Sequence, residues 1–202
     1  MEPGTPFGAS IQSLAIYLRY THAISDERLA ALCGQVYGVP IREGALANLF
    51  QRVKHRLDHR VAAILTRLRR SRLLGRDETS ARVNGQQQWE WVFQNAEVCI
   101  PVIRPSRGQG VIQEVLGAHR PTIWVSALYS AQQKHPAEDW QVCVAHQLRD
   151  GQFALEAGAT VFAPCMKAGL LRAFAIHKRR ATLAASTRYQ YRCDLSRRLD
   201  RC

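Results

Sequence analysis

The chain has 202 residues and is 47% hydrophobic, a composition that excludes wholesale disorder and suffices for one sizeable core plus a small accessory domain. Its formal net charge of +12 indicates a polyanionic partner, and we favour nucleic acid over an anionic membrane surface. No apolar run approaches the roughly 18 residues that span a bilayer, and the first residues lack the pattern of a signal peptide, so we expect a cytoplasmic protein without a membrane partner.

Residues 25–50 predict two helices joined by a tight turn. Ser25 can cap the first helix, and Gly38 falls where the chain must reverse. This outline is typical of a helix-turn-helix, whose second helix enters the DNA major groove, although any two-helix hairpin looks similar. The apolar residues expected in its core are Leu29, Leu32, Val36, Val39 and Ile41.

The basic residues gather in two blocks, 52–76 and 167–201, which hold 19 of the 28 lysines and arginines. In the first block apolar residues recur at helical spacing, with Leu57 and Val61 at the centre, so we expect a long helix with one packed face and one cationic face. A solvated helix face would give the same pattern, but two separated blocks favour DNA contact. The predicted DNA-binding residues of the two blocks are Arg52, Lys54, Arg56, Arg69, Arg70, Lys178, Arg179 and Arg180.

From about Leu73 the pattern changes to short strands. "WEWVF" and "VCIPVI" are rich in β-branched and aromatic residues and are separated by "QNAE", which predicts a hairpin turn. Helix and strand patterns then alternate through "SRGQGVIQEVLG", "PTIWVSALYS", "WQVCVAHQLRD" and "VFAPCMKAGLLRAFAIHKRR". This order predicts an α/β domain with a mixed sheet, and we expect Asp77 near the end of its first strand.

Several consecutive motifs carry a family resemblance. "GRDETSARVNGQQQWEWVFQN", "VIRPSRGQGVIQEVLGAHRPTIWVS", "LYSAQ" and "VCVAHQLRD", with "YTHAISDERLAAL" and "YGVPIREGALANL" upstream, resemble the transposases of the insertion-sequence sixty-six family. The resemblance covers nearly the whole chain. It implies an RNase H-like core with an Asp-Asp-Glu triad, and an activity that cuts and joins DNA at terminal inverted repeats.

The resemblance matches Asp77, in "RDET", to the first catalytic aspartate and therefore to a Mg²⁺ ligand. Phosphodiester transesterification uses two divalent ions about 3.5–4 Å apart, and carboxylates must hold them. Glu78 points to the opposite side of a strand, so we expect it to have a supporting role. Without the resemblance, Asp77 is interpreted as a strand-end residue hydrogen-bonded to the following turn.

The chain departs from the family at the second catalytic position. The family pattern Ser-Asp-x-Tyr-Ser-Ala matches residues 126–131, where Ala127 replaces the aspartate. The third residue, a glutamate, is expected beyond Cys202. We therefore expect a helical DNA-binding region over 1–70 and an incomplete, inactive RNase H-like domain over 71–202. Its expected partners are terminal-repeat DNA and either further copies of this chain, as a homo-oligomer, or an intact transposase. The alternatives are a repressor or competitor at element ends, or a basic helical interaction module.

Cys143 and His146 have a spacing compatible with zinc, but a structural zinc site needs four ligands and no second pair stands nearby. We expect Cys143 to be a small buried residue and His146 to be polar support beside the active site. The six cysteines have no paired spacing, which favours free thiols in a reducing compartment.

The "RPSRG" segment offers two further cations. Guanidinium groups match phosphate geometry, so Arg104 and Arg107 are predicted DNA contacts, with pairing to acids as the alternative. Trp89 and Trp91 lie on one face of a predicted strand, and core packing is favoured over base stacking for them.

Overall fold

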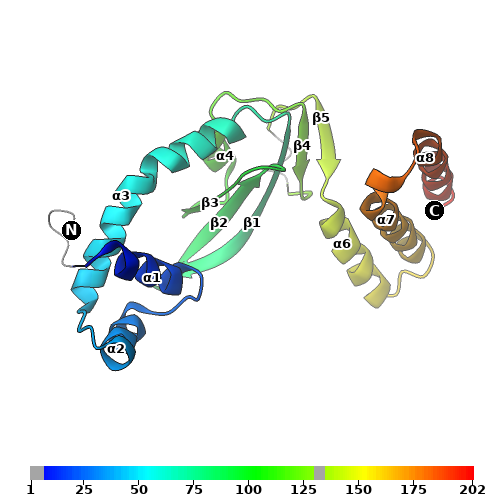
Figure 1. The fold of residues 1–202 in the computed structure, drawn as a ribbon. Coiled ribbons are helices and arrows are strands. Elements are labelled where there is room, and N and C mark those ends of the chain that lie inside the picture. Colours follow the sequence, from blue (N-terminus) through cyan, green and yellow to red (C-terminus); the bar gives the residue numbers. More distant parts are fainter. Residues whose placement is uncertain (1–6, 130–134) are drawn as a thin grey trace. The chain divides into compact units, whose positions relative to one another are not determined.

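The computed structural model describes residues 7–129 and 135–202 of the chain. Its contacts divide the chain into two compact units, Met1–Thr66 and Arg67–Cys202, and each unit is described by itself. Figure 1 shows helices in blue and cyan for the first unit and a sheet in green within the second. The division lies four residues before the boundary at residue 70 that the sequence predicts.

The first unit contains α1 (Ala9–Tyr20), α2 (Asp26–Tyr37) and most of α3 (Glu43–Leu68). The Ser25 side chain accepts a hydrogen bond from the backbone N–H of Arg28, which caps α2 as predicted. Gly38 has φ +64°, a left-handed conformation that glycine adopts without steric cost, and it ends α2. The predicted two-helix arrangement is therefore confirmed. The buried residues of the first unit's core are Ala15, Leu29, Cys33, Ile41, Leu46, Leu49 and Phe50.

Two details of the predicted helical packing are wrong. Val36 is 63% exposed, because it lies in the last turn of α2 beyond the core, whereas Cys33 lies one turn after Leu29 and is buried. On α3, Leu57 and Val61 are about half exposed, so the apolar stripe is not covered along the middle of the helix. The long helix is packed at its ends rather than along one continuous face.

The second unit is built on a five-stranded sheet with the order β3-β2-β1-β4-β5. The strands β1 (Leu73–Val83), β2 (Gln86–Gln94) and β3 (Cys99–Arg104) form antiparallel pairs. Strands β4 (Ile123–Ser126) and β5 (Asp139–Val142) run parallel to β1, and helix α4 (Gln109–Leu116) lies in the connection between β3 and β4. The fold class predicted from the sequence, a helical N-terminal region followed by an α/β domain with a mixed sheet, is confirmed.

Strand β1 is longer than the sequence analysis expected. It continues to a two-residue turn at Asn84 (φ +52°) and Gly85 (φ +74°), the dihedral signs of a type I′ hairpin, for which Asn-Gly is the preferred pair. Asp77 is consequently the fifth of eleven residues in β1. The expectation that it lies near the strand end, beside a turn, is wrong.

The two faces of the sheet differ in burial. One face carries large side chains that are almost fully buried, and the Nε1–H of Trp91 on this face donates to the Ser106 carbonyl at 3.0 Å. The segment before α4 therefore lies over this face. On the opposite face Leu73 and Ile103 remain about half exposed. The buried side chains of this unit include Leu74, Trp91, Phe93, Ile112, Leu116 and Trp124.

Three helices follow the sheet: α6 (Val144–Glu156), α7 (Phe162–Lys178) and α8 (Ala185–Leu199), with a short 3₁₀ turn, η1 (Arg180–Thr182), between the last two. A disulfide joins Cys165 to Cys202, so the prediction that all cysteines are free thiols is wrong. Their sequence separation of 37 residues concealed the pair, because α7 and α8 pack side by side only in the folded chain. Within residues 7–129 and 135–202, no helix is long and apolar enough to cross a membrane.

Candidate active site

Asp77 occupies the middle of β1 on the less covered face of the sheet. Its side chain is 53% exposed, and its Oδ1 accepts a hydrogen bond from the backbone N–H of Glu78 at 2.9 Å. Side chains alternate between faces along a strand, so Asp77 and Glu78 point in opposite directions, as the sequence predicted. The Asp77 carboxylate is free to meet a ligand from solvent.

Ala127 follows the last residue of β4, the strand that runs parallel to β1. Gly75 pairs with Val125 in this ladder, and continuing the register by two residues sets Ala127 beside Asp77 on the same face. The neighbouring position therefore has a methyl group where a carboxylate would complete a metal-binding pair. Ser130 and Ala131, which complete the matched motif, lie outside the described residues.

His146 is the side chain nearest to Asp77 from the following helix. Its Nε2 lies 3.5 Å from Asp77 Oδ1, and the side chain is 20% exposed. The backbone N–H of Cys143 donates to the Ser126 carbonyl at 2.7 Å, which fixes the start of α6 beside the end of β4. The expectation that His146 supports Asp77 agrees with this contact.

The described side chains do not fit the two-metal site that the resemblance implies. Two magnesium ions need several hard oxygen ligands, but this position offers one carboxylate, an alanine and an imidazole. Throughout the part of the chain that the structure describes, no three His, Cys, Asp or Glu residues are grouped so as to hold a metal ion. The side chain that Asp77 meets here is the imidazole of His146, at 3.5 Å.

Glu78 lies behind Asp77 in a buried ion-pair network. Its carboxylate is 1% exposed and accepts from Arg76, whose side chain is 0% exposed, at 3.1 Å and from Arg107 at 3.0 Å. The Arg76 guanidinium also lies 4.4 Å from the Trp91 ring centroid. Burial lowers the pKa of Arg76 to about 10, and the negative charge of Glu78 opposes that decrease.

Arg107 links this network to the segment after β4. Its guanidinium lies 4.6 Å from the Trp89 ring centroid and 3.9 Å from that of Tyr129, two residues beyond Ala127. Trp89 is therefore partly buried against Arg107, whereas Trp91 has the core position that the sequence favoured for both. Arg107 therefore bridges strands β1 and β2 and the residues that follow β4.

Arg104 also pairs with an acid. Its guanidinium forms hydrogen bonds of 3.0 Å to both carboxylate oxygens of Glu114 on α4. The hydrogen bond with Arg104 lowers the pKa of the Glu114 carboxyl, and the same bond raises the pKa of Arg104. The alternative of acid pairing that the sequence left open therefore describes the observed contacts of Arg104 and Arg107.

The other predicted DNA-binding residues lie on several elements of the two units. In the first unit Arg52, Lys54 and Arg56 lie on α3, and Lys54 pairs with Asp58 at 3.3 Å. In the second unit Arg69 and Arg70 are both exposed, and the Nε–H of Arg69 donates to the Val115 carbonyl at 2.8 Å. Exposed cations also lie at the end of α7 and the start of η1, at Lys178, Arg179 and Arg180.

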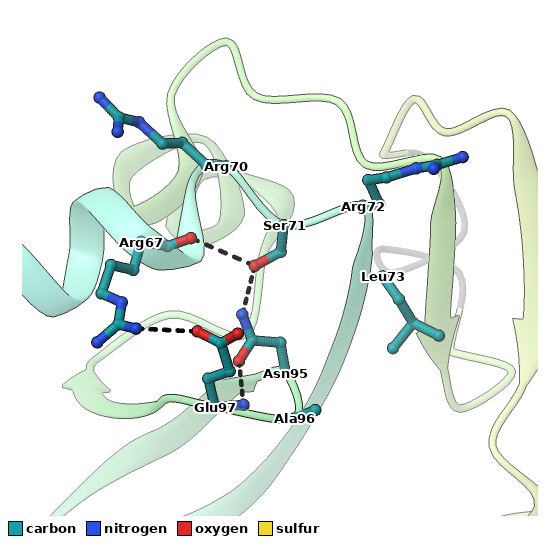
Figure 2. A pocket seen from close by; sticks show the side chains of 8 residues that line it. All are labelled: Arg67, Arg70, Ser71, Arg72, Leu73, Asn95, Ala96 and Glu97. Atoms are coloured by element: carbon teal, nitrogen blue, oxygen red, sulfur yellow. Dashed lines mark hydrogen bonds and ion pairs between the residues drawn. The ribbon is translucent and has the colours of Figure 1, made fainter.

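A cavity of about 470 Å³ lies where the chain enters β1 (Figure 2). Arg67 in its wall pairs with Glu97 at 3.1 Å, and Asn95 donates to the Ser71 hydroxyl. Figure 2 shows that the side chains of Arg70 and Arg72 point away from each other. These arginines do not converge on one point, so the cavity lacks the geometry of an anion site. Its lining residues are Arg67, Arg70, Ser71, Arg72, Leu73, Asn95, Ala96 and Glu97.

Sequence reasoning missed the buried role of Arg76. The available signal was its position two residues before Glu78 on a predicted strand, because residues i and i+2 share one face and can form an ion pair. Trp91 of β2 and Trp124 of β4 supply the rings that lie near the guanidinium. The pair could have been expected, although not its nearly complete burial.

Comparison with known families gives one match. The family model described as "Transposase IS66 family" matches residues 4–201, nearly the whole chain. No curated protein matches the chain.

Proposed function

Since the chain belongs to the transposase IS66 family, we propose that it is a DNA-binding transposase relative that does not itself cut or join DNA strands. The observation that carries the proposal is Ala127, set beside Asp77 by the parallel register of β1 and β4. A methyl group cannot coordinate a metal ion, so one carboxylate remains where strand transfer needs a converging set. The proposal includes two roles: residues 1–70 form a helical DNA-binding region, and residues 71–202 form an incomplete RNase H-like domain.

Charge and exposure support DNA as the partner. The net charge of +12 favours binding to polyanions, and Arg70, Lys178 and Arg179 present exposed cations at the surface. The proposed target is the terminal inverted repeat of the element. Binding there, by the chain alone, as an oligomer or beside an intact transposase, would make it a competitor or repressor.

The first test of inactivity is a nicking assay. Supercoiled plasmid carrying the terminal repeats is incubated with the purified chain and either Mg²⁺ or Mn²⁺, with Asp77→Ala as the matched control for contaminating nuclease. We expect no nicking above that control. Metal-dependent nicking that Asp77→Ala abolishes would overturn the proposal.

A second test restores the missing carboxylate. Ala127→Asp sets a second acid beside Asp77, so Mn²⁺ should bind the folded state more tightly than in the parent chain. A Mn²⁺ concentration tenfold above the dissociation constant stabilises the folded state by about 1.4 kcal/mol, which urea unfolding resolves. Ala127→Asn controls for side-chain size. Equal Mn²⁺ responses of the two variants would contradict the assignment of residue 127.

DNA binding is tested by fluorescence anisotropy on terminal-repeat and scrambled duplexes across a salt series. Each phosphate neutralised contributes about −0.9 to the slope of log affinity against log salt. Removing Lys178 and Arg179 together should flatten the slope by up to about 1.8. Preference for the repeat supports a repressor or competitor. Equal binding to both duplexes would indicate charge without sequence reading, and no binding would refute the DNA-binding half of the proposal.

A further inference from the structure

A basic groove is lined by residues of η1 and α8. It has a volume of about 380 Å³ and is separate from the residues around Asp77. We refer to it as the α8 groove. Its lining residues are Arg180, Ala185, Arg188, Tyr189 and Arg192.

The α8 groove combines cations with an exposed aromatic ring. Tyr189 is 62% exposed, and the Arg192 guanidinium lies 5.4 Å from its ring centroid. No ion pair joins Arg180, Arg188 or Arg192 to an acid in the described part of the chain. The exposed ring and the neighbouring guanidinium groups are therefore accessible to an external ligand.

The acid of α8 lies on its other side. Asp194 accepts from Arg172 of α7 at 3.0 Å and from Arg198 at 3.1 Å, and these arginines lower the pKa of its carboxyl. On this side of α8 the arginines therefore have an acidic partner within the chain. On the side that carries Arg188 and Arg192, the positive charge has no acidic partner among the described residues and can attract an external anion.

We propose that the α8 groove binds single-stranded DNA, with Tyr189 stacking on an unpaired base and the three arginines contacting its phosphates. This inference rests on the proposed function for the identity of the polyanion. Aromatic rings stack on bases of any sequence, and arginine matches phosphate geometry with paired N–H donors. A base inside a duplex has both faces covered by its neighbours. Tyr189 can therefore stack only on a base of an unpaired strand. The cavity volume is within the range of small-ligand pockets, which suits one nucleotide.

The discriminating experiment compares a labelled oligothymidine with the terminal-repeat duplex, using the full chain and its variants. Tyr189→Ala should weaken oligothymidine binding roughly tenfold, the lower to middle range for loss of one stacked base, and should leave duplex affinity within about twofold. Tyr189→Phe keeps the ring and should bind like the parent chain. Because Tyr189 is mostly exposed, we expect an unchanged urea midpoint in both variants.

The arginines are tested by charge removal at matched positions. Arg188→Ala with Arg192→Ala should lower the salt slope on oligothymidine by about 1.4, since a single strand contributes about 0.7 for each phosphate. Arg82→Ala, at an exposed position in β1, removes a charge elsewhere and should change the slope by less. If Tyr189→Ala weakens the binding of heparin as much as the binding of oligothymidine, the α8 groove is a general polyanion surface and the proposal is overturned.

The outcomes separate this inference from the proposed function. If the parent chain binds the duplex but Tyr189→Ala binds oligothymidine like the parent chain, the α8 groove is not a single-strand site and the proposed function stands. If the parent chain binds neither DNA, both fail. Loss of oligothymidine binding in Tyr189→Ala, with recovery in Tyr189→Phe, is the expected result.

Discussion

Replacing Glu78 by glutamine should destabilise the second unit strongly. The substitution keeps the size of the side chain but removes the negative charge that lies between Arg76 and Arg107. The guanidinium of Arg76 then remains buried without a counter-charge. Its Nε and Nη1 have no hydrogen-bond partner among the described residues, so Glu78 supplies its charged hydrogen bond through Nη2.

The magnitude follows from this burial. Removing one member of a buried ion pair costs about 3–5 kcal/mol, and we expect about 3 kcal/mol because glutamine retains an acceptor oxygen and Arg107 can turn toward solvent. For a chain of this size that change corresponds to a fall in Tm of roughly 10 °C. It is a large part of the 5–15 kcal/mol that a typical domain has available.

Glu97→Gln is the matched control for Glu78→Gln. It removes the same charge from the Arg67–Glu97 pair, whose side chains are 66% and 67% exposed, and should cost less than about 1 kcal/mol. Urea unfolding followed by tryptophan fluorescence measures both variants, since Trp91 contacts Arg76. Equal destabilisation by the two substitutions would refute the reasoning from burial.

Two further predictions concern the disulfide and a buried histidine. Thiol titration of the denatured chain should count four thiols before reduction, and six after the Cys165–Cys202 bond is reduced. Opening this loop should cost about 4 kcal/mol by loss of chain constraint, and six reactive thiols before reduction would contradict the pairing. Burial lowers the pKa of His135, so the unfolded chain takes up this proton at higher pH than the folded chain, and stability should fall as pH drops below about 6.5. The urea midpoint should fall less between pH 7.5 and pH 5.5 in His135→Gln than in the parent chain. The same fall in both would show that His135 does not cause the pH dependence.

Local signals explain most of the elements that the sequence predicted correctly. The Ser25 cap and the left-handed Gly38 depend on a few adjacent residues, so both could be identified without tertiary contacts. The alternation of β-branched and aromatic residues likewise located β2 and β3. Side chains alternate between the two faces of a strand, so the sequence also predicted that Glu78 and Asp77 lie on opposite faces.

The length of β1 was within reach of the sequence but was missed. Asn84-Gly85 is the strongest short hairpin signal, yet the polar run Gln86–Gln88 on its far side does not alternate with apolar residues. Its side chains are mostly exposed, so this part of the hairpin needs no apolar face. Recognising the turn would have placed Asp77 in the middle of its strand.

Other features depend on contacts that sequence spacing does not encode. The approach of Cys165 to Cys202 requires α8 to fold back on α7. The burial of Arg76 depends on Trp91 and Trp124 arriving from two different strands. The α8 groove also needs η1 to bring Arg180 near the start of the last helix.

The parallel pairing of β1 with β4 has a consequence for the order of folding. The hairpin that carries Asp77 closes through a two-residue turn, whereas the contact between Leu73 and Ile123 joins positions about fifty residues apart. Closing the longer loop costs more chain entropy, so the hairpin should form first and β4 should dock later. During synthesis, Asp77 is therefore held in its strand before residue 127 can lie beside it. The pairing that defines this site should therefore be completed only after the hairpin has formed.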